Sequence, residues 1–224
     1  SDKAGLEDDP WEGVRLRPED ARSRRELTLD ELKRLLAAAQ RAGDEWHKLF
    51  LIGLYTGLRL GDCCRLDWSS VNLASGVIQL IPSKTRRHAH GHPVTIPIHA
   101  ELRAALTAGG IGAESFGVPS SGPVLTRIAS EYHVARWRVD YGISRIFADA
   151  GIVTSVRVEG RVRLAPEATF HSLRHTFVSL SANAGVPLHV VQSIVGHEST
   201  SMTRHYYHEN ITALRQAVDA IPSL

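Results

Sequence analysis

Cysteine, long apolar runs and a strong net charge are all lacking in this sequence of 224 residues. Its two cysteines, Cys63 and Cys64, are adjacent, so they cannot build a framework of disulfide bridges, and a reducing, cytoplasmic setting is the natural interpretation. The best apolar run, residues 50–55, is far shorter than the roughly 20 residues of a membrane-spanning helix. No charged and then apolar secretory leader opens the sequence. We therefore expect neither a membrane-embedded nor an exported protein.

The charge balance does not identify a partner. Lys and Arg number 26 against 24 Asp and Glu, which gives a formal charge of +2 and does not by itself establish a nucleic-acid partner. The twelve histidines are more informative, because imidazole can add positive charge beside a polyanion, transfer protons or bind a metal. With 43% hydrophobic and 22% charged residues, a disordered or fibrous chain is excluded, and the length favours one domain.

Hydrophobic periodicity predicts a mainly helical protein. Thr28 and Glu31 form a capping box ahead of leucines at helical spacing, so we expect a helix that runs to about Ala42. A second apolar helix is expected at 45–55, closed by a glycine, and a third at 60–68. Further helices are expected at 101–108, 130–150, 172–184, 187–195, 199–206 and 211–221.

Strand signals are fewer and shorter. Residues 77–81 and 94–98 are predicted to form two antiparallel strands joined by a long basic, His-rich loop. Residues 155–164 alternate apolar and polar side chains, which predicts a small hairpin with a basic face. The expected fold class is therefore mainly α with a small antiparallel β-sheet (α+β). We also expect Trp137 and Tyr141 to be core residues, and the two cysteines to be buried structural thiols.

Two arginines are suited to phosphodiester chemistry. Arg59 follows a glycine turn at the start of a predicted helix, and Arg174 lies three residues after His171, so these last two share one helical face. A phosphodiester under attack gains negative charge on its non-bridging oxygens, and an always-charged guanidinium binds such oxygens with two parallel hydrogen bonds. No Ser-His-Asp or Cys-His arrangement with a recognisable local signature is visible.

Four separated segments together carry a family resemblance. They are Thr56-Gly-Leu-Arg59-Leu-Gly-Asp62, Ser83-Lys84-Thr85, His171-Ser-Leu-Arg174-His175-Thr176, and Gly196-His197 followed nine positions after the histidine by Tyr206 and then by His208. In this order and at these spacings, over residues 26–220, they resemble the catalytic domain of the tyrosine recombinases, the phage-integrase family. The resemblance implies the fold of that catalytic domain.

The resemblance makes Tyr206, rather than the adjacent Tyr207, the nucleophile. Its product would be a 3'-phosphotyrosyl link with a free 5'-hydroxyl, and because the link conserves the energy of the broken bond, rejoining needs no ATP, metal or other cofactor. A phenol with an ordinary pKa of about 10 is a poor nucleophile, but neighbouring arginines and a histidine would favour its phenolate. Lys84 corresponds to the general acid that protonates the leaving 5'-oxygen.

The other matched positions would surround the phosphate. Arg59 and Arg174 correspond to the arginines that bind it, and His197 to the histidine that hydrogen-bonds it. His171 corresponds to the group that assists proton transfer at the tyrosine, and Asp62 to an acidic residue that supports the site. We expect His175 and His208 to be core or helix-capping partners.

The expected activity is site-specific recombination or integration of DNA. The same chemistry is used by type IB topoisomerases, and a DNA-binding regulator that keeps the fold but does not cut is a second alternative. A third is a metal-dependent nuclease using His88, His90 and His92, although the neighbouring cations would repel a metal ion. We expect no metal there, and interpret this loop as facing DNA.

The resemblance also implies a domain arrangement and partners. Residues 1–25 would be a linker from a missing N-terminal core-binding domain, and 26–224 the catalytic domain. The expected partner is double-stranded DNA, bound by a homotetramer on two DNA sites with C-terminal elements such as 211–221 passed between protomers, and with an accessory DNA-bending protein as a further partner. The free fragment is expected to be monomeric. Sequence-independent phosphate affinity is assigned to Arg86, Arg87, Arg136, Arg138, Arg157, Arg161 and Arg163.

Overall fold

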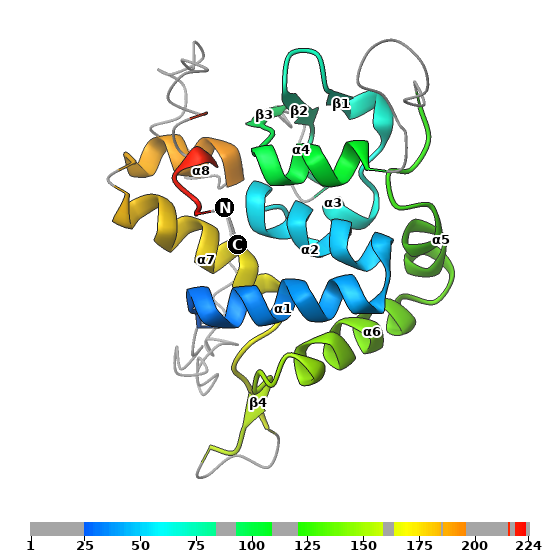
Figure 1. Cartoon of the computed structure of the whole chain (residues 1–224), viewed down its shortest axis with the longest axis vertical. Helices are drawn as coiled ribbons and strands as arrows, with labels where there is room; N and C mark the ends of the chain where they lie inside the picture. The colour runs from blue at the N-terminus through cyan, green and yellow to red at the C-terminus, as the bar shows by residue number, and fades with distance from the viewer. Residues whose placement is uncertain are drawn as a thin grey trace, which may run out of the picture.

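Helix α2 (Asp44–Thr56) lies at the centre of the described structure and is buried on nearly all sides from its third residue onward. A helix that is apolar all round has to be surrounded by other elements. Helices α1 (Leu29–Ala42), α4 (Ala100–Thr107) and α7 (Phe170–Asn183) pack against it, with α1 and α4 on opposite sides in Figure 1. The computed structural model describes residues 25–83, 93–108, 121–158, 164–184, 186–195, 215 and 218–222.

Helix α1 begins as its capping box predicts. The Thr28 side chain accepts a hydrogen bond from the Glu31 backbone, and the Glu31 side chain accepts one from the Thr28 backbone, which satisfies two amides of the first turn. The Glu31 carboxylate also accepts two hydrogen bonds from the Arg25 guanidinium, at 2.6 and 2.7 Å. Arg25 in turn donates to Glu167, so the first described residue is tied to the segment that precedes α7.

Helices α2 and α7 approach each other closely at Gly53. A Cβ atom built there would lie 2.6 Å from Cζ of Phe170, so a larger residue would push the helices apart. The rings of Phe50 and Phe170 pack edge to face beside this contact, with centroids 5.6 Å apart. Helix α7 starts two residues earlier than expected because Thr169 caps it, accepting from the backbone amide of His171.

The turn after α2 determines where α3 (Leu60–Cys64) starts. Gly57 ends α2 in the left-handed conformation, with φ of 63°, and a Cβ there would lie 2.9 Å from Cγ1 of Val195. The expected helix over 60–68 was too long, because α3 ends at Cys64 and a 3-10 turn, η1 (Trp68–Ser70), follows. Asp67 accepts from the backbone of Ser69 and starts the new turn. Cys64 and its neighbour Cys63 are buried free thiols, as expected.

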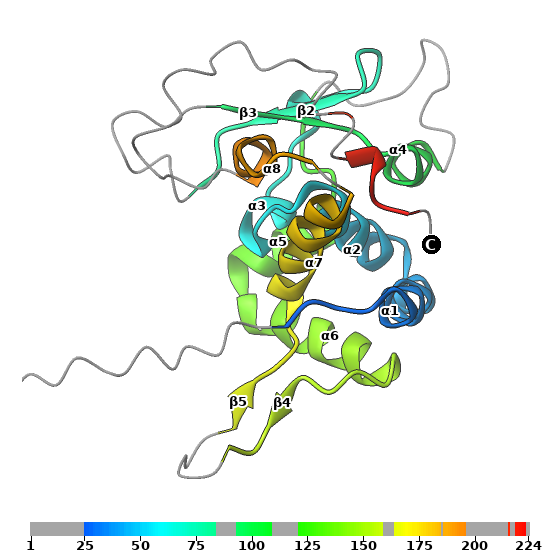
Figure 2. The ribbon, with the colours of Figure 1, turned by 90° about the vertical axis from the view of Figure 1, so that its left-hand side faces the viewer.

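The antiparallel strand pair is confirmed and gains a third member. Strands β2 (Val77–Leu80) and β3 (Val94–Pro97) pair with Ile78 opposite Ile96, and both isoleucines are fully buried. The two-residue β1 (Val71–Asn72), which the sequence analysis missed, pairs with the other edge of β2. Helix α8 (Leu188–Val195) contacts β3 and lies under the sheet in Figure 2.

The single helix expected at 130–150 is wrong, because two helices occupy this stretch. Helix α5 (Thr126–Val134) is followed by α6 (Arg136–Asp149), and Ala135 between them has φ of −149° and ψ of 65°, outside the helical region. A tertiary contact also starts α5 earlier than the sequence pattern indicates. The Glu45 carboxylate, from α2, accepts hydrogen bonds from the backbone amides of residues 127 and 128.

The expectation that Trp137 and Tyr141 are core residues is also wrong. They are 66% and 58% exposed, on the outer face of α6. The buried face of that helix carries aliphatic residues and a phenylalanine at helical spacing, namely Val139, Ile143, Ile146 and Phe147. Because these four fill the contact with α1, the aromatic pair is rotated toward solvent.

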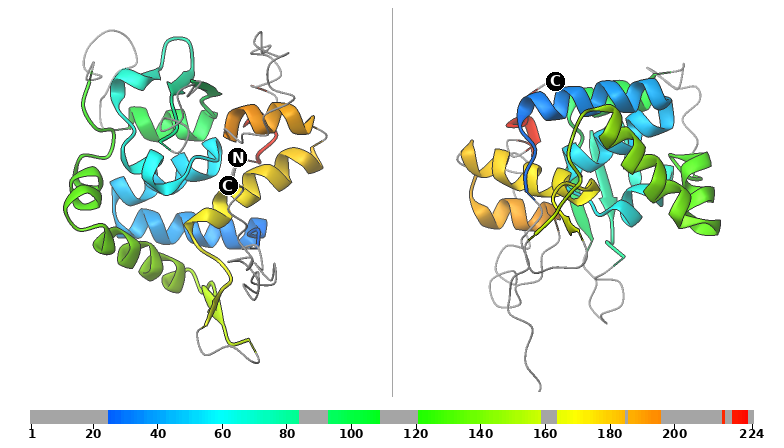
Figure 3. Two further views of the ribbon diagram at one scale, coloured as in Figure 1. Left: turned by 180° about the vertical axis from the view of Figure 1, so that it is seen from behind. Right: turned by 90° about the horizontal axis from the view of Figure 1, so that it is seen from below.

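The expected hairpin is present and projects from the helices, as Figures 2 and 3 show. Strand β4 (Ser155–Val156) pairs with β5 (Ala165–Pro166), so the second strand lies just beyond the expected range of 155–164. Backbone hydrogen bonds from Glu167 to Thr154 and from Arg25 to Glu167 close the base of the hairpin. The residues between 158 and 164 lie outside the described ranges.

Helix α4 joins α2 to the end of the described chain. The Tyr55 hydroxyl donates to Glu101 at 2.6 Å, and its ring stacks on His99, the residue that caps α4. Val218 and Ile221 are buried against this region, so the described part of the C-terminal segment packs on its own chain. The helix expected at 199–206 and most of that at 211–221 lie outside the described residues. None of the helices in the described ranges has the length and apolar character needed to cross a membrane.

Acid should remove the contribution of the Arg25–Glu31 pair. The hydrogen bonds from Arg25 lower the pKa of Glu31 to about 2, from 4.5. A carboxyl group whose pKa is lowered by folding raises the free energy of unfolding above about pH 4.5, and this contribution is lost as the pH falls toward 2. Glu31→Gln should therefore cost about 1 kcal/mol at pH 7 and flatten this part of the pH profile in urea denaturation. Glu26→Gln, at an exposed neighbour, should keep the wild-type profile, and a wild-type profile for Glu31→Gln would contradict the assignment.

Replacing Gly57 should destabilise the fold more than replacing a glycine of similar backbone conformation in open space. Gly57→Ala brings a methyl group against Val195 and Phe177 in addition to the left-handed backbone, so a loss of about 2 to 4 kcal/mol is expected. Gly76 has a similar φ of 68° with nothing closer than 3.7 Å, so Gly76→Ala should cost about 1 kcal/mol. Equal losses in urea denaturation would show that the contact with α7 and α8 does not matter.

Candidate active site

Arg174 lies at the centre of the candidate site and is 3% exposed. From the second turn of α7, its Nη1 donates to the carbonyl of Gly57 and its Nη2 to the carbonyl of Val195, both at 2.7 Å. These carbonyls stand at the ends of α2 and α8, where helices carry unpaired acceptors and partial negative charge. One buried guanidinium therefore joins the ends of α2 and α8 to the second turn of α7.

Arg59 and Asp62 enter the same site from α3. Arg59 is the residue that precedes this helix, and Asp62 lies in its first turn, so the turn at Gly57 directs both side chains. Oδ1 of Asp62 accepts a hydrogen bond from the backbone of Ser83 at 2.9 Å. Among the described residues, Nη1 of Arg59 and Oδ2 of Asp62 are buried and have no hydrogen-bond partner. An unpaired buried guanidinium nitrogen is a donor available to an anion.

The electrostatics of the site favour an anionic ligand. Burial, and then the nearby positive charge of Arg59, lower the pKa of Arg174 to about 10, while Asp62 acts in the opposite direction. Arg174 stays charged at neutral pH, so two guanidinium groups lie near one carboxylate, and Asp62 also pairs with the Arg65 side chain at 4.0 Å. A phosphodiester oxygen would supply the negative charge that this arrangement lacks.

His171 lies one turn before Arg174 on α7, as its spacing predicts, and is partly buried. Its ring packs edge to face against His175, with centroids 4.9 Å apart. The sequence analysis assigned His175 only a core or capping role, yet this residue is partly exposed and contacts a candidate site residue. The separation of four residues on a helix is the signal that could have placed the two imidazoles together.

The remaining sequence-predicted site residues lie outside the described ranges. They are Lys84, His197 and Tyr206, together with the three histidines at 88, 90 and 92. Two of their neighbours are placed: Ser83, just before Lys84, is bound by Asp62, and Val195, two residues before His197, is bound by Arg174. Within the described ranges, no group of three or more His, Cys, Asp or Glu side chains is arranged to hold a metal ion.

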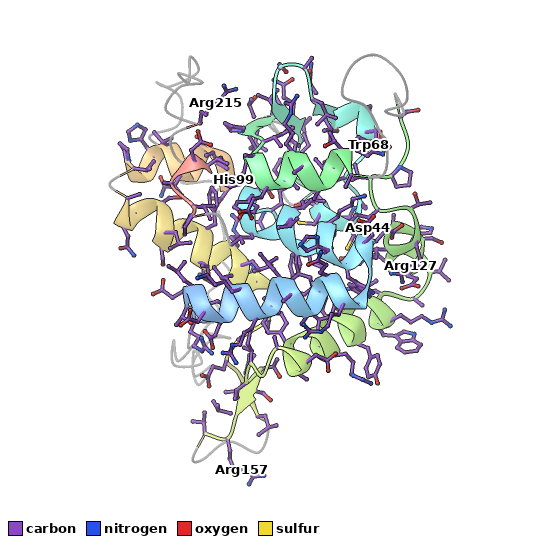
Figure 4. All side chains as sticks on the ribbon, in the orientation of Figure 1. Asp44, Trp68, His99, Arg127, Arg157 and Arg215 are labelled. Carbon is purple, nitrogen blue, oxygen red and sulfur yellow. The ribbon has the colours of Figure 1, made fainter. Side chains whose placement is uncertain are left out.

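Three of the surface arginines expected to contact DNA are described, and they lie on α6 and beside β4 rather than on α3 or α7. Arg136 pairs with Asp140 on α6, and Arg138 lies over the ring of Trp137. Arg157 is exposed on the hairpin, where Figure 4 shows it at the far end from the helices. Arg86, Arg87, Arg161 and Arg163 lie outside the described residues.

Asp62 should matter for stability because it is a buried carboxylate whose charge offsets that of Arg59 beside the buried Arg174. Asp62→Asn keeps an acceptor for Ser83 but removes the negative charge beside Arg59 and Arg174, so a loss of about 1 to 3 kcal/mol is expected. Asp140→Asn removes only an exposed partner of Arg136 and should change stability by less than about 0.5 kcal/mol. Urea denaturation of both variants at pH 7 measures the difference, and equal effects would contradict this role of Asp62.

Known proteins with similar sequences are recombinases. Tyrosine recombinase XerA of Thermococcus kodakarensis is 29% identical over 195 residues, which cover 85% of this chain and 60% of the relative. Tyrosine recombinase XerC of Mycobacterium sp. (strain KMS) is 26% identical over 164 residues, which cover 73% of this chain and 49% of the relative. The chain thus spans about half to three fifths of the length of these relatives.

The fold has a counterpart among solved structures. A lambda integrase dimer bound to a COC' core site matches with a TM-score of 0.59 and 22% identity, over 85% of this chain and 63% of the integrase chain. A likeness at this identity concerns the fold. The sequence model of the phage integrase family matches residues 25–212, which span most of the chain and all four segments of the candidate site. The chain belongs to the phage integrase family.

Proposed function

We propose that this chain is the catalytic domain of a site-specific DNA recombinase or integrase. The observation that carries the proposal is the pair of buried Arg174 and half-buried Arg59, which lies close to Asp62 and leaves the buried Nη1 of Arg59 without a partner among the described residues. Such a pair suits a phosphodiester, whose non-bridging oxygens gain charge during attack. Membership of the phage integrase family, and the names of the relatives, support the same reaction.

In the proposed reaction, the Tyr206 oxygen attacks the phosphorus and the bond to the 5'-oxygen breaks. The products are a 3'-phosphotyrosyl link and a 5'-hydroxyl whose proton comes from Lys84. The reverse attack by a 5'-hydroxyl rejoins the strand, without ATP or metal. Arg59 and Arg174 hold the phosphate together with His197.

Arg174 has a second task in this proposal. Its hydrogen bonds to Gly57 and Val195 fix the guanidinium before substrate arrives, so little reorganisation is needed when charge develops on the phosphate. His171 would move the tyrosine proton, and its edge-to-face contact with His175 restricts the orientation of its ring. Asp62 positions Ser83, the residue directly before Lys84.

The proposed partner is double-stranded DNA in the cytoplasm, bound by a tetramer on two DNA sites with the help of a DNA-bending protein. The lambda integrase that shares this fold was solved on a DNA core site, which supports DNA as the partner. Residues 1–25 would connect to a core-binding domain, and the free fragment would be monomeric. Arg157 projects on the hairpin, whereas Arg136 and Arg138 already contact Asp140 and Trp137, so Arg157 is the stronger described candidate for a phosphate contact.

A covalent protein–DNA complex is the direct test. The protein is incubated in EDTA with fragmented DNA from its source and with nicked duplexes that let the cut end diffuse away, and is then run on a denaturing gel. We expect a DNA-shifted band for the wild type and for Tyr207→Phe, and none for Tyr206→Phe, because only the Tyr206 oxygen forms the bond.

Other outcomes would overturn parts of the proposal. A band that depends on Tyr207 would move the nucleophile by one residue. Measurable DNA binding without any band, in the chain restored to full length, would favour a non-cutting DNA-binding protein. Cleavage of any sequence, with relaxation of supercoiled DNA, would favour a type IB topoisomerase, and activity lost in EDTA would favour a metal-dependent nuclease.

A further inference from the structure

The outer face of α6 carries a set of side chains that the proposed reaction does not use. We call it the α6 strip: Trp137, Arg138, Tyr141 and Arg145 of α6, together with Val134, the last residue of α5. The apolar members are 80%, 66% and 58% exposed, for Val134, Trp137 and Tyr141 in turn. Seen from below in Figure 3, α6 lies on the outside of the molecule beside α1. Single exposed apolar residues are common, but two aromatic rings on successive turns form a patch.

The composition of the α6 strip is that of a protein-binding surface. Trp, Tyr and Arg are the residues that dominate binding energy at interfaces. The guanidinium of Arg138 lies 5.5 Å from the centroid of the Trp137 ring, and Nη1 of Arg145 donates to the Tyr141 hydroxyl at 3.3 Å. Arg138 therefore lies over one aromatic ring and Arg145 lies beside the hydroxyl of the other, so the strip presents a combined apolar and cationic surface.

The charge of the α6 strip points to an acidic partner. On the same helix Arg136 is paired with Asp140 at 3.4 Å. In the described part of the chain, neither Arg138 nor Arg145 has a carboxylate within ion-pair distance, and Asp149, one turn further along, is the acidic group that attracts Arg145. A partner with two or more carboxylates next to an apolar side chain would match this surface.

We propose that the α6 strip binds residues 6–12 of this same chain. That segment reads Leu-Glu-Asp-Asp-Pro-Trp-Glu and combines four carboxylates with a leucine and Trp11. Arg138 and Arg145 are seven residues apart, about 10 Å along a helix. The three residue-to-residue steps from Asp9 to Glu12 would also span about 10 Å in an extended chain.

The chain is long enough to make this contact. The described structure begins at Arg25, whose side chain and backbone bond Glu167 at the base of the hairpin that follows α6. The thirteen residues from Glu12 to Arg25 reach at most about 45 Å when extended, about twice the 21 Å length of a 14-residue helix such as α6.

Fluorine NMR of the whole chain labelled with 5-fluorotryptophan tests the proposal without any DNA cleavage. The sequence has four tryptophans, of which Trp46 and Trp68 are buried and serve as internal references. We expect the resonances of Trp11 and Trp137 to shift together in Glu7→Gln/Asp8→Asn/Asp9→Asn and, for Trp11, also in Arg138→Ala/Arg145→Ala. High salt should produce the same shifts, because it screens the exposed charges. The matched control, Lys33→Ala/Arg41→Ala, removes two exposed cations of α1 and should shift neither resonance.

Three results would overturn the proposal. A Trp11 resonance that ignores Arg138→Ala/Arg145→Ala would show that the segment does not contact the α6 strip. Shifts that depend on protein concentration would assign the contact to a second copy of the chain. A Trp137 resonance that moves with added duplex DNA but not in the acidic-segment variant would make the α6 strip a nucleic-acid surface. Since the readout is a resonance and not a cut strand, each result is independent of whether Tyr206 cleaves DNA.

Discussion

The hydrogen bonds of Arg174 to two helix-terminal carbonyls are the interaction on which the site depends. Gly57 and Val195 end helices that are 138 positions apart in the sequence, and one guanidinium joins them. The carbonyls at helix ends carry partial negative charge, so this buried cation is solvated by the fold rather than by water. The same two bonds leave the guanidinium little freedom to turn, which is what preorganised binding of a phosphate requires.

The geometry of the chain around Gly57 follows from this interaction. The left-handed turn exposes its own carbonyl to Arg174, allows the side chains of Val195 and Phe177 to come close, and starts α3 with Arg59. A second cation beside Arg174 is unfavourable unless a negative charge is near. Asp62 supplies a single negative charge for the two cations Arg59 and Arg174. Stability and ligand affinity are therefore linked, because a bound anion would neutralise the positive charge of Arg59 and Arg174 that Asp62 leaves unbalanced.

The sequence predicts local features well where the signal is local. The capping box at Thr28 and the glycine closure of α2 are decided by a few neighbouring residues, and the structure confirms both. The motif spacing also places Arg59 and Asp62 beside Arg174, three residues that no single helical pattern would join. The predictions that were wrong concern features set by contacts between elements or by a local break in the helix. The Glu45 carboxylate starts α5 from another helix, Ala135 leaves the helical region, and the packing of α6 on α1 turns Trp137 outward.

The base of the hairpin has a consequence for engineering the molecule. Backbone hydrogen bonds join Thr154 to Glu167 and Glu167 to Arg25, and the Arg25 side chain closes onto the same glutamate. Three segments of the chain, around Arg25, Thr154 and Glu167, are thus held together at the base of the hairpin. This base lies just before the first turn of α7, which carries His171. A shortened chain that starts after Arg25 would lose two of these hydrogen bonds, so both the base of the hairpin and the start of α7 would be loosened.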